Sequence, residues 1–354
     1  QTSLFIQDQL SSFGIPFTIM GRTGVIGLIE GKDPQSRCIA LRADIDALPI
    51  TEENDISYKS KNVGVMHACG HDVHTTCLLG AAKILLTLKD EWTGTIKLIF
   101  QPGEEKHPGG ASLLIKDGVL ENPAPHGIIG LHVHPGLDAG KLSFRKGMVM
   151  ASADEIYITI SGPGGHAAAP QLTTDIVLIA AQIIVALQQV VSRNANPFSP
   201  SVLSICAING GTATNIIPRE IKLMGTFRAM DEAWRAKAHL IIKKITIDIA
   251  SSMGANAEIN ILKGYPTVKN DPTFTGNAWK LDEEFQGKEN VSETELRMGA
   301  EDFGFYSQEI PGCFFRLGVR NEAKNIIHNV HTPKFNIDES AIETGMGIMA
   351  WLGA

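Results

Sequence analysis

The sequence predicts an α/β protein, with a discontinuous domain built on a mostly parallel central sheet and an inserted ferredoxin-like α+β domain. Two observations predict this class. Strand-like and helical runs alternate over the first 150 residues, as they do in parallel sheets covered by helices. Between residues 154 and 264 the order becomes βαββαβ, which is the order of a ferredoxin-like unit. The length of 354 residues also exceeds what one core usually supports.

Apolar periodicity predicts the individual elements. In the first segment we expect strands at 37–42, 95–101 and 127–132, and helices at 75–89 and 111–117. In the inserted segment we expect strands at 155–161, 201–208, 220–230 and 257–263, and helices at 174–193 and 232–253. A helix at 275–285, a strand at 313–318 and a helix at 339–352 follow. The expected domains are therefore 1–153 with 265–354, and 154–264.

Composition and charge exclude several classes of protein. With 44% hydrophobic and 19% charged residues, the chain can bury a sizeable core. A net charge of -7 without a basic stripe argues against nucleic acid as a partner. No uninterrupted apolar run reaches the roughly 18 residues of a membrane helix. Five scattered cysteines favour a reducing compartment over a disulfide framework. We expect a cytoplasmic protein that acts on small molecules.

The densest polar cluster, MHACGHDVH at 66–74, directly precedes an apolar helix. Imidazoles, a thiol and a carboxylate beside a glycine suit a loop that folds around a divalent cation. Cys69 and His71 are the stronger ligand candidates, and His67 and His74 are the weaker ones. A nucleophilic Cys69 with His71 as its base is the competing interpretation, but nucleophile and base usually come from distant segments.

The second cluster is a pair of carboxylates, Glu104 and Glu105, at the end of an apolar strand. Adjacent carboxylates repel each other unless cations neutralise them. A catalytic metal site needs both a carboxylate ligand and a base for the water. Glu104 and Glu105 can divide these roles, although a pair of glutamates in isolation is more often a solvated turn.

Further histidines follow predicted strands. His132 and His134 come after the run that ends at Leu131, and His132 is the better ligand candidate because it lies at the carboxyl end of the strand. His331 precedes Thr332 and Pro333, and His328 is its rival. The spacing alone leaves the choice between His328 and His331 open.

Three groups of the inserted segment could contact a substrate. His166 ends the glycine-rich turn GPGGH, which lacks the spacing of a phosphate-binding loop. Asn215 follows the run GGTAT, and Arg228 lies near the end of a predicted strand. An arginine there can bind a carboxylate through two hydrogen bonds, or it can be an ordinary surface residue.

Together these motifs resemble the M20 metallopeptidases, and within them the amidohydrolase branch of hippurate hydrolases, auxin-conjugate hydrolases and N-acetyl-diaminopimelate deacetylases. The similarity covers nearly the whole chain in family order, through the blocks LRADIDALP at 41–49, 66–74, QPGEE at 101–105, GLHV at 130–133, GGHAA at 164–168, NIIP at 215–218, GAEDF at 299–303 and HTP at 331–333. One departure is Gln171, where many relatives carry His.

The resemblance implies a catalytic domain with a two-metal centre, and a lid domain that also mediates dimerisation. The implied metal ligands are Cys69, His71, Glu105, His132 and His331, so the resemblance favours His331 over His328. It implies Glu104 as general base and His166 as a group that reaches the site from the lid. The implied ions are manganese, zinc, nickel or cobalt. We place Asp44 and Asp46 behind the ligands, and Asn215 and Arg228 on the substrate.

The expected reaction is the hydrolysis of the amide bond of N-acyl amino acids by water that two ions activate, with Glu104 accepting its proton. Two alternatives remain. One is a dipeptidase or exopeptidase of the same family. The other is a protein that only binds metal or ligand on this scaffold, against which the intact Glu104 argues.

Overall fold

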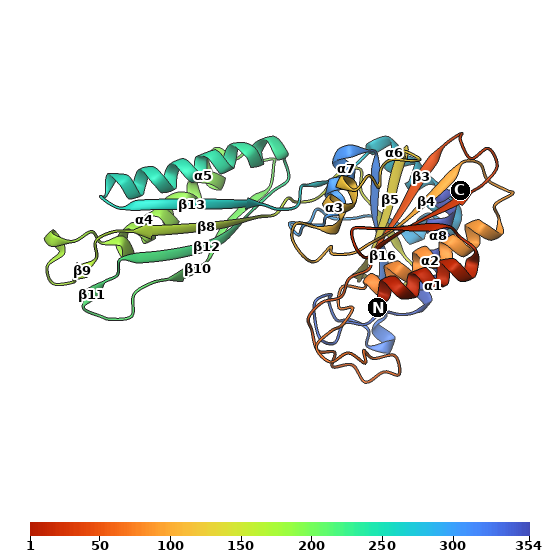
Figure 1. Ribbon diagram of the computed structural model, residues 1–354, viewed down its shortest axis with the longest axis horizontal. Helices are drawn as coiled ribbons and strands as arrows, with labels where there is room; N and C mark the ends of the chain where they lie inside the picture. The colour runs from red at the N-terminus through yellow and green to blue at the C-terminus, as the bar shows by residue number, and fades with distance from the viewer. The chain divides into compact units, whose positions relative to one another are not determined.

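The computed structural model describes residues 1–354 and divides them into two compact units (Figure 1). Unit 1 comprises Gln1–Val149, Val268–Leu296 and Asp302–Ala354, and unit 2 comprises Met150–Thr267 and Arg297–Glu301. The expected inserted segment, 154–264, lies inside unit 2. The short segment Arg297–Glu301, which we expected in the first domain, belongs to unit 2, where the Ala151 N–H donates to the carbonyl of Arg297. The role of this unit as a lid and dimerisation domain stays a prediction.

Unit 1 contains a sheet of eight strands in the order β1-β2-β4-β3-β5-β16-β6-β15. The strands β3, β4, β5 and β16 run parallel to one another, β2 and β6 pair with β4 and β16 in the antiparallel direction, and β1 pairs antiparallel with β2. The predicted mostly parallel central sheet is therefore confirmed. The strands of unit 1 are β1 (Phe17–Met20), β2 (Gly24–Glu30), β3 (Cys38–Asp44), β4 (Thr95–Gln101), β5 (Gly127–Asp138), β6 (Leu142–Phe144), β15 (Val291–Glu293) and β16 (Gly312–Arg320), with β7 (Gly147–Met150) and β14 (Val268–Asn270) as a separate pair.

Helices cover both faces of this sheet (Figure 1). On one face, α2 and α8 pack their apolar side chains, such as Leu78 and Ile348, into the main core with Leu41 and Leu131 of the strands. On the other face, Phe303 of α7 packs against Phe314, with 4.9 Å between the ring centroids. The helices are α1 (Thr2–Phe13), α2 (His71–Thr87), α3 (Gly110–Lys116), α6 (Pro272–Gln286), α7 (Phe303–Glu309) and α8 (Ser340–Gly353).

The parallel strands bring the polar motifs to one edge of the sheet. Every residue of β3 and β4 is buried, which explains why both read as continuous apolar runs. Asp44 at the end of β3 pairs with Gln101 at the end of β4. The pairing of β3 with β5 ends at Gly130 of β5. His132 lies two residues further along β5, past the last residue that pairs with β3. The carboxyl edge of such a sheet is where ligand sites form.

Unit 2 has the predicted ferredoxin-like order. Its antiparallel sheet, β10-β12-β8-β13, packs with two helices around a core that includes Ile158, Ile183 and Ile242. Asp175 and Asp231 cap the two helices by accepting N–H bonds of the first turn. The elements are β8 (Asp154–Ser161), α4 (Ile176–Gln189), β10 (Ser201–Asn209), β12 (Glu220–Ala229), α5 (Glu232–Ser252) and β13 (Asn256–Lys263), with β9 (Gly165–His166) paired to β11 (Ile216–Ile217).

Unit 2 contains a long apolar helix and an exposed cysteine. One helix, Ile176–Asn194, is long and apolar enough to cross a membrane by length and composition, with a mean hydropathy of 1.8 and 33% of the stretch buried. Glutamines interrupt this stretch, so it contains no uninterrupted apolar run of the roughly 18 residues typical of a membrane helix. The apolar sequence context of Cys206, like that of Cys38, Cys77 and Cys313, predicted a packing residue. That prediction was wrong for Cys206, which is exposed at the position where β10 shifts register against β12.

Candidate metal centre

The loop before α2 presents two candidate ligands from a tight turn. Gly70 adopts a left-handed conformation with φ 82°, which favours glycine. A Cβ atom on Gly70 would lie 2.5 Å from Cγ2 of Val133, so no other residue fits without a shift. The turn therefore places Cys69 and His71 on either side of Gly70 and against β5.

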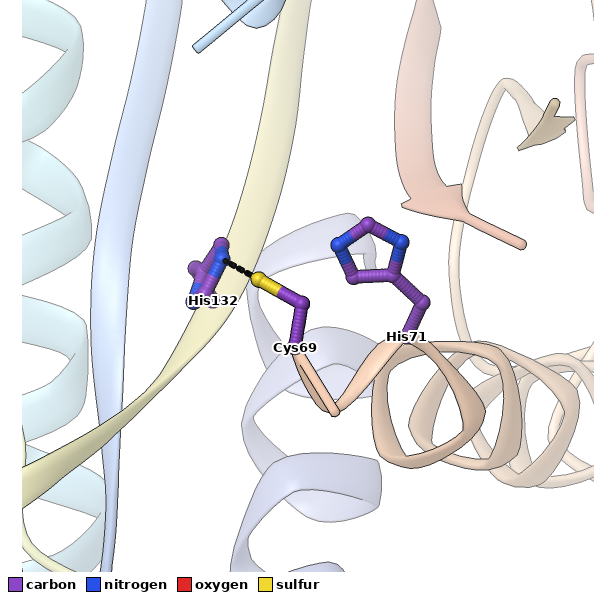
Figure 2. Close-up of side chains that lie close together, drawn as sticks. All are labelled: Cys69, His71 and His132. Atoms are coloured by element: carbon purple, nitrogen blue, oxygen red, sulfur yellow. Dashed lines mark hydrogen bonds between the residues drawn. The ribbon is translucent and has the colours of Figure 1, made fainter. Parts of the chain in front are cut away.

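Cys69, His71 and His132 form the first group of candidate ligands. Their ligand atoms lie within 4.8 Å of one another, and all three residues are buried. Figure 2 shows the Sγ atom of Cys69 pointing at the ring of His132, 3.4 Å from Nε2, with His71 on the other side of the thiol. Such a set of one sulfur and two nitrogens suits zinc and similar ions.

Cys69, Glu105 and His331 form a second group of the same kind. Nε2 of His331 lies 3.2 Å from the thiol of Cys69 and 3.1 Å from Oε1 of Glu105. His331 adopts a left-handed φ of 63°, which costs about 1 kcal/mol or more in a non-glycine residue. Its N–H donates to the carbonyl of Ala68 at 2.7 Å, which holds this conformation beside Cys69. The two groups share the thiol of Cys69.

The hydrogen bonds of two rings leave nitrogen lone pairs facing the shared thiol. Nδ1 of His71 lies 3.2 Å from Oδ1 of Asp46, and Nδ1 of His132 lies 2.8 Å from the carbonyl oxygen of Val133. In the neutral form of each ring Nδ1 therefore carries the proton, and Nε2 is an acceptor. Nε2 of His71 is buried without a hydrogen-bond partner. Buried polar atoms rarely lack partners, so this donor set fits bound cations.

The thiol of Cys69 lies in surroundings that oppose its ionisation. Burial raises the pKa of Cys69, and the carboxylates of Glu105 and Glu104 raise it further. A reactive nucleophilic cysteine has the opposite surroundings, with nearby cations that lower its pKa. The ligand interpretation of Cys69 therefore fits the structure better than the nucleophile interpretation.

The carboxylates around the two groups have different surroundings. Glu104 is buried and has a carboxylate oxygen within 4.8 Å of ligand atoms of His71 and Glu105. Asp46 accepts the backbone N–H of Glu105 at 2.9 Å, besides the bond from His71. Asp44 is fully buried and lies 3.7 Å from Nε2 of His71. Both aspartates therefore lie directly behind the candidate ligands.

The remaining histidines of these motifs do not join either group. His74 is buried beside Asp44 and His71, but both of its ring nitrogens have protein partners. His67, His134 and His328 belong to no group of converging ligand atoms. Of His328 and His331, only His331 contacts Cys69.

In unit 2 the structure brings two of the three predicted residues together. His166 in β9 pairs with Ile216 in β11, and the N–H of Ala167 donates to the carbonyl of Asn215. β11 and Asn215 precede the Glu220 end of β12 in the chain, whereas Arg228 lies near the Ala229 end of that strand. There Nε of Arg228 donates to the hydroxyl of Thr226 at 3.1 Å. Arg228 is therefore separated from His166 and Asn215 within this unit.

A buried polar network that the sequence did not predict lies behind the ligands. Arg42 donates to Asp44 and to Asp302, and Gln101 bonds to both Arg42 and Asp302. All four side chains have 0% exposure. A signal existed, since Arg42 is a charged residue in an otherwise apolar strand and Asp302 lies in the GAEDF block. The partners could not be paired from sequence because they are far apart in the chain.

Comparisons with known proteins find relatives over nearly the whole chain. The sequence model of the peptidase family M20/M25/M40 matches residues 40–352. Thermostable carboxypeptidase 1 from Saccharolobus solfataricus is 41% identical over 348 residues, which are 97% of this chain and 87% of the relative. N-acetyl-L-cysteine deacetylase from Bacillus subtilis is 38% identical over 343 residues, 97% of this chain and 80% of the relative.

A solved structure is also similar over the whole chain. The dinuclear metal-binding M20 peptidase from Bacillus subtilis superposes with a TM-score of 0.85 at 33% identity, and the match covers 99% of this chain and 90% of that one. That protein is described as binding two metal ions, which corresponds to the two groups of candidate ligands that share Cys69 here.

Proposed function

This chain belongs to the peptidase family M20/M25/M40 and is a metal-dependent hydrolase of amide bonds, and we propose that its substrates are N-acyl amino acids. The observation that carries the proposal is the pair of ligand groups that share Cys69 and lie beside the buried Glu104. The relatives include a deacetylase and a carboxypeptidase, so the two substrate classes to compare are N-acyl amino acids and peptides.

We assign Cys69, His71 and His132 to one divalent ion and Cys69, Glu105 and His331 to the other. Manganese, zinc, nickel and cobalt all suit a mixed set of sulfur, nitrogen and carboxylate oxygen. Two such ions, when bound, lower the pKa of water and polarise the carbonyl group of the substrate. Asp46 keeps His71 in the tautomer that offers Nε2, and the carbonyl of Val133 does the same for His132.

Glu104 is the general base in this proposal. Its carboxylate lies beside the ligand atoms of His71 and Glu105, so it can accept a proton from the attacking water and return it to the leaving amine. Positioned proton transfer of this kind contributes about 10²–10⁴-fold to a rate. The neighbouring Glu105 cannot take this role while it acts as a ligand.

His166 is the proposed donor to the oxyanion. The N–H of Ala168 donates to Nδ1 of His166 at 3.0 Å, so the neutral ring carries its proton on Nε2. Nε2–H is then a hydrogen-bond donor on an exposed side chain. A donor at the position where negative charge develops is worth about 3 kcal/mol. Asn215, which adjoins His166 across the β9–β11 pair, is the proposed ligand for a carbonyl or carboxylate of the substrate.

The layout of unit 2 favours a dimer that shares its sites. Eight residue steps of β12 separate Glu220 from Arg228, which is about 25 Å. His166 lies beyond the Glu220 end, whereas Arg228 lies at the end near the linkers, where the Ser152 N–H donates to the carbonyl of Ala229. One small substrate cannot contact both groups of the same copy. We propose that Arg228 on one side, and His166 with Asn215 on the other, serve two different sites of a dimer.

The edge strand β10 is the proposed contact between the two copies. No residue of β10 is charged, and Val202 and Ile208 are exposed. The opposite edge strand, β13, carries Glu258 and Lys263, and charges on an edge oppose pairing. Exposed Val177 and Val185 of α4 add apolar surface in the same unit. Association through β10 therefore requires no charge to be buried.

The substrate proposal is tested against its main alternative, a dipeptidase. The purified chain, loaded separately with manganese, zinc, nickel and cobalt, is given an N-acetyl amino acid and a free-amine dipeptide with the same C-terminal residue. We expect kcat/KM to be at least about tenfold higher for the N-acetyl compound, equivalent to about 1.4 kcal/mol. The reverse preference would assign the chain to the peptidases. No turnover of either substrate class by the metal-loaded chain would favour the non-catalytic alternative.

A cytoplasmic location completes the proposal. The five cysteines are all free, and four of them are buried, which suits a reducing compartment.

A further inference from the structure

His74 lies one helical turn after the candidate ligand His71, and its side chain has 0% exposure. Its Nδ1 atom is 2.5 Å from Oδ1 of Asp44. On the other side of the ring, Nε2 accepts the backbone N–H of Val133 at 2.9 Å. Both nitrogens are therefore occupied by protein groups from β3 and β5.

These two bonds determine the tautomer of His74. A backbone N–H can only donate, so Nε2 uses its lone pair to accept the bond from Val133. The ring proton is then on Nδ1, from which it is donated to Asp44. With one nitrogen carrying the proton and the other offering a lone pair, the ring is neutral. No lone pair remains for a metal ion, although Asp44, His71 and His74 converge like ligands.

A buried network holds the Asp44 side of this contact. Nη1 of Arg42 donates to Asp44 at 2.7 Å, and Nη2 donates to Asp302 at 2.8 Å. Asp302 also accepts bonds from the amide of Gln101 and from the N–H of Ala111. Bonds between charged and polar groups are strong at such low exposure. Asp44 therefore has a fixed orientation, and so does the ring of His74 that binds it.

The other side of the contact leads to a candidate ligand. Val133 donates its N–H to His74 and, through its carbonyl, accepts Nδ1–H of His132 at 2.8 Å. The same residue contacts the Cys69 loop, since Gly70 packs against its side chain. A displacement of Val133 would change the direction of the ring of His132. A continuous chain of contacts thus runs from Asp302 through Arg42, Asp44, His74 and Val133 to His132.

We propose that His74 is a positioning residue, which binds no metal itself and holds Val133 so that Nε2 of His132 points at the ion bound with Cys69 and His71. This inference rests on the proposed two-metal function and deepens it. Groups that orient a metal ligand typically contribute 10–100-fold to metal affinity. We expect the larger loss for the ion of the Cys69, His71 and His132 group, because His132 belongs to that group alone.

Two amide variants separate the bonds of His74. The amide of His74→Asn ends near the position of Nδ1, so it can keep the bond to Asp44 but cannot reach Val133. The amide of His74→Gln ends near Nε2 and can still accept the N–H of Val133. The matched control is Asp282→Asn. Like His74, Asp282 is a fully buried titratable residue with a side-chain partner, here Gln286, but it lies in α6 and in none of the groups of converging ligand atoms.

The measurement is the affinity for zinc or manganese alone, obtained by competition with a chelator on the full chain. We expect His74→Asn to lower the affinity for one of the two ions by about 10–100-fold. The affinity for the second ion should stay close to that of the wild type. We expect His74→Gln to recover most of this loss and Asp282→Asn to show none. Equal affinities of His74→Asn and wild type for both ions would overturn the inference. A wild-type chain that binds no divalent ion would instead refute the proposed function.

Nitrogen chemical shifts of the wild-type histidines provide a second test that needs no folded variant. We expect His74 to carry its proton on Nδ1 in the metal-free chain and to keep it there when zinc is added, whereas the Nε2 signals of His71 and His132 move. A proton on Nε2 of His74, or a direct effect of zinc on that nitrogen, would show that His74 is a ligand or has another role.

Discussion

His71 and Asp46 form a hydrogen bond of 3.2 Å, in which the ring Nδ1–H donates to Oδ1 and Nε2 is left facing Cys69 and Glu105. The second oxygen of Asp46 accepts the N–H of Glu105 at 2.9 Å. One carboxylate therefore orients a histidine from α2 and the loop that carries Glu104 and Glu105. This arrangement fixes the orientation of the loop, so that Glu104 and Glu105, although adjacent in the chain, can act as base and as ligand respectively.

The first prediction concerns Glu104→Gln. The amide can hold a water molecule but cannot accept its proton, so we expect kcat to fall by about 10²–10⁴-fold, while metal content stays close to wild type. Metal analysis and kcat measured on the same preparation provide the check. Near-normal turnover in a fully metal-loaded Glu104→Gln enzyme would remove Glu104 from the role of base.

The second prediction concerns the thiol of Cys69. As a metal ligand it should react with a thiol reagent more slowly in the metal-loaded protein than after treatment with a chelator. Cys206, which belongs to no group of candidate ligands, is the internal control, because its rate should not depend on metal. Mass spectrometry of the alkylated peptides distinguishes the two sites. Equal rates at Cys69 in both forms, or a trapped acyl group on Cys69, would contradict the ligand assignment.

The third prediction uses Asp282, whose side chain is fully buried in α6. Burial raises the pKa of Asp282 to about 7, although the bond from Gln286 opposes this shift. Because the folded-state pKa lies above the unfolded value, the native state binds the proton more tightly. Its contribution to stability is present below about pH 4 and is lost as the pH rises to about 7.

Asp282→Asn removes this pH dependence. At pH 8 we expect the variant to be more stable than the wild type by about 2–4 kcal/mol, and at pH 4 to differ little. The check is the difference in Tm between the two proteins at each pH, measured without metal in both cases. A difference that does not change with pH would show that Asp282 titrates normally in the folded protein.

The fourth prediction follows from the separation of His166 and Arg228 within unit 2. We expect inactive Glu104→Gln and inactive His166→Ala chains to recover activity when they exchange subunits, because one site of each mixed dimer then has both groups. Random exchange of a two-fold dimer should yield about a quarter of wild-type activity. If labelled subunits exchange but no activity returns, His166 serves its own chain.

Sequence reasoning predicted the elements with strong periodicity and the candidate ligands. The buried strands β3 and β4 read as apolar runs, and Cys69 and His71 stood out because reactive residue types rarely cluster beside a glycine. The short strands β6, β7, β14 and β15 were missed, since three or four residues carry too little periodicity to recognise.

The orientation of the candidate ligands could not be predicted for a different reason. The partners Arg42 and Asp302 are 260 positions apart, and those of His74 lie 30 and 59 positions away. Such contacts exist only once the sheet has formed, and they decide which ring nitrogen carries a proton. The spacing of a motif gives the residue types of a site, whereas the tautomers depend on tertiary neighbours.

The most direct test of the account is the rate of amino-acid release from an N-acetyl amino acid as zinc or manganese is titrated into the chelator-treated chain, with bound metal counted at each point. We predict no turnover without metal, full turnover only when two ions are bound per chain, and no turnover at any metal content in Glu104→Gln. Full turnover of the metal-free chain, or turnover that is complete with no ion bound to the Cys69 groups, would contradict the two-metal mechanism.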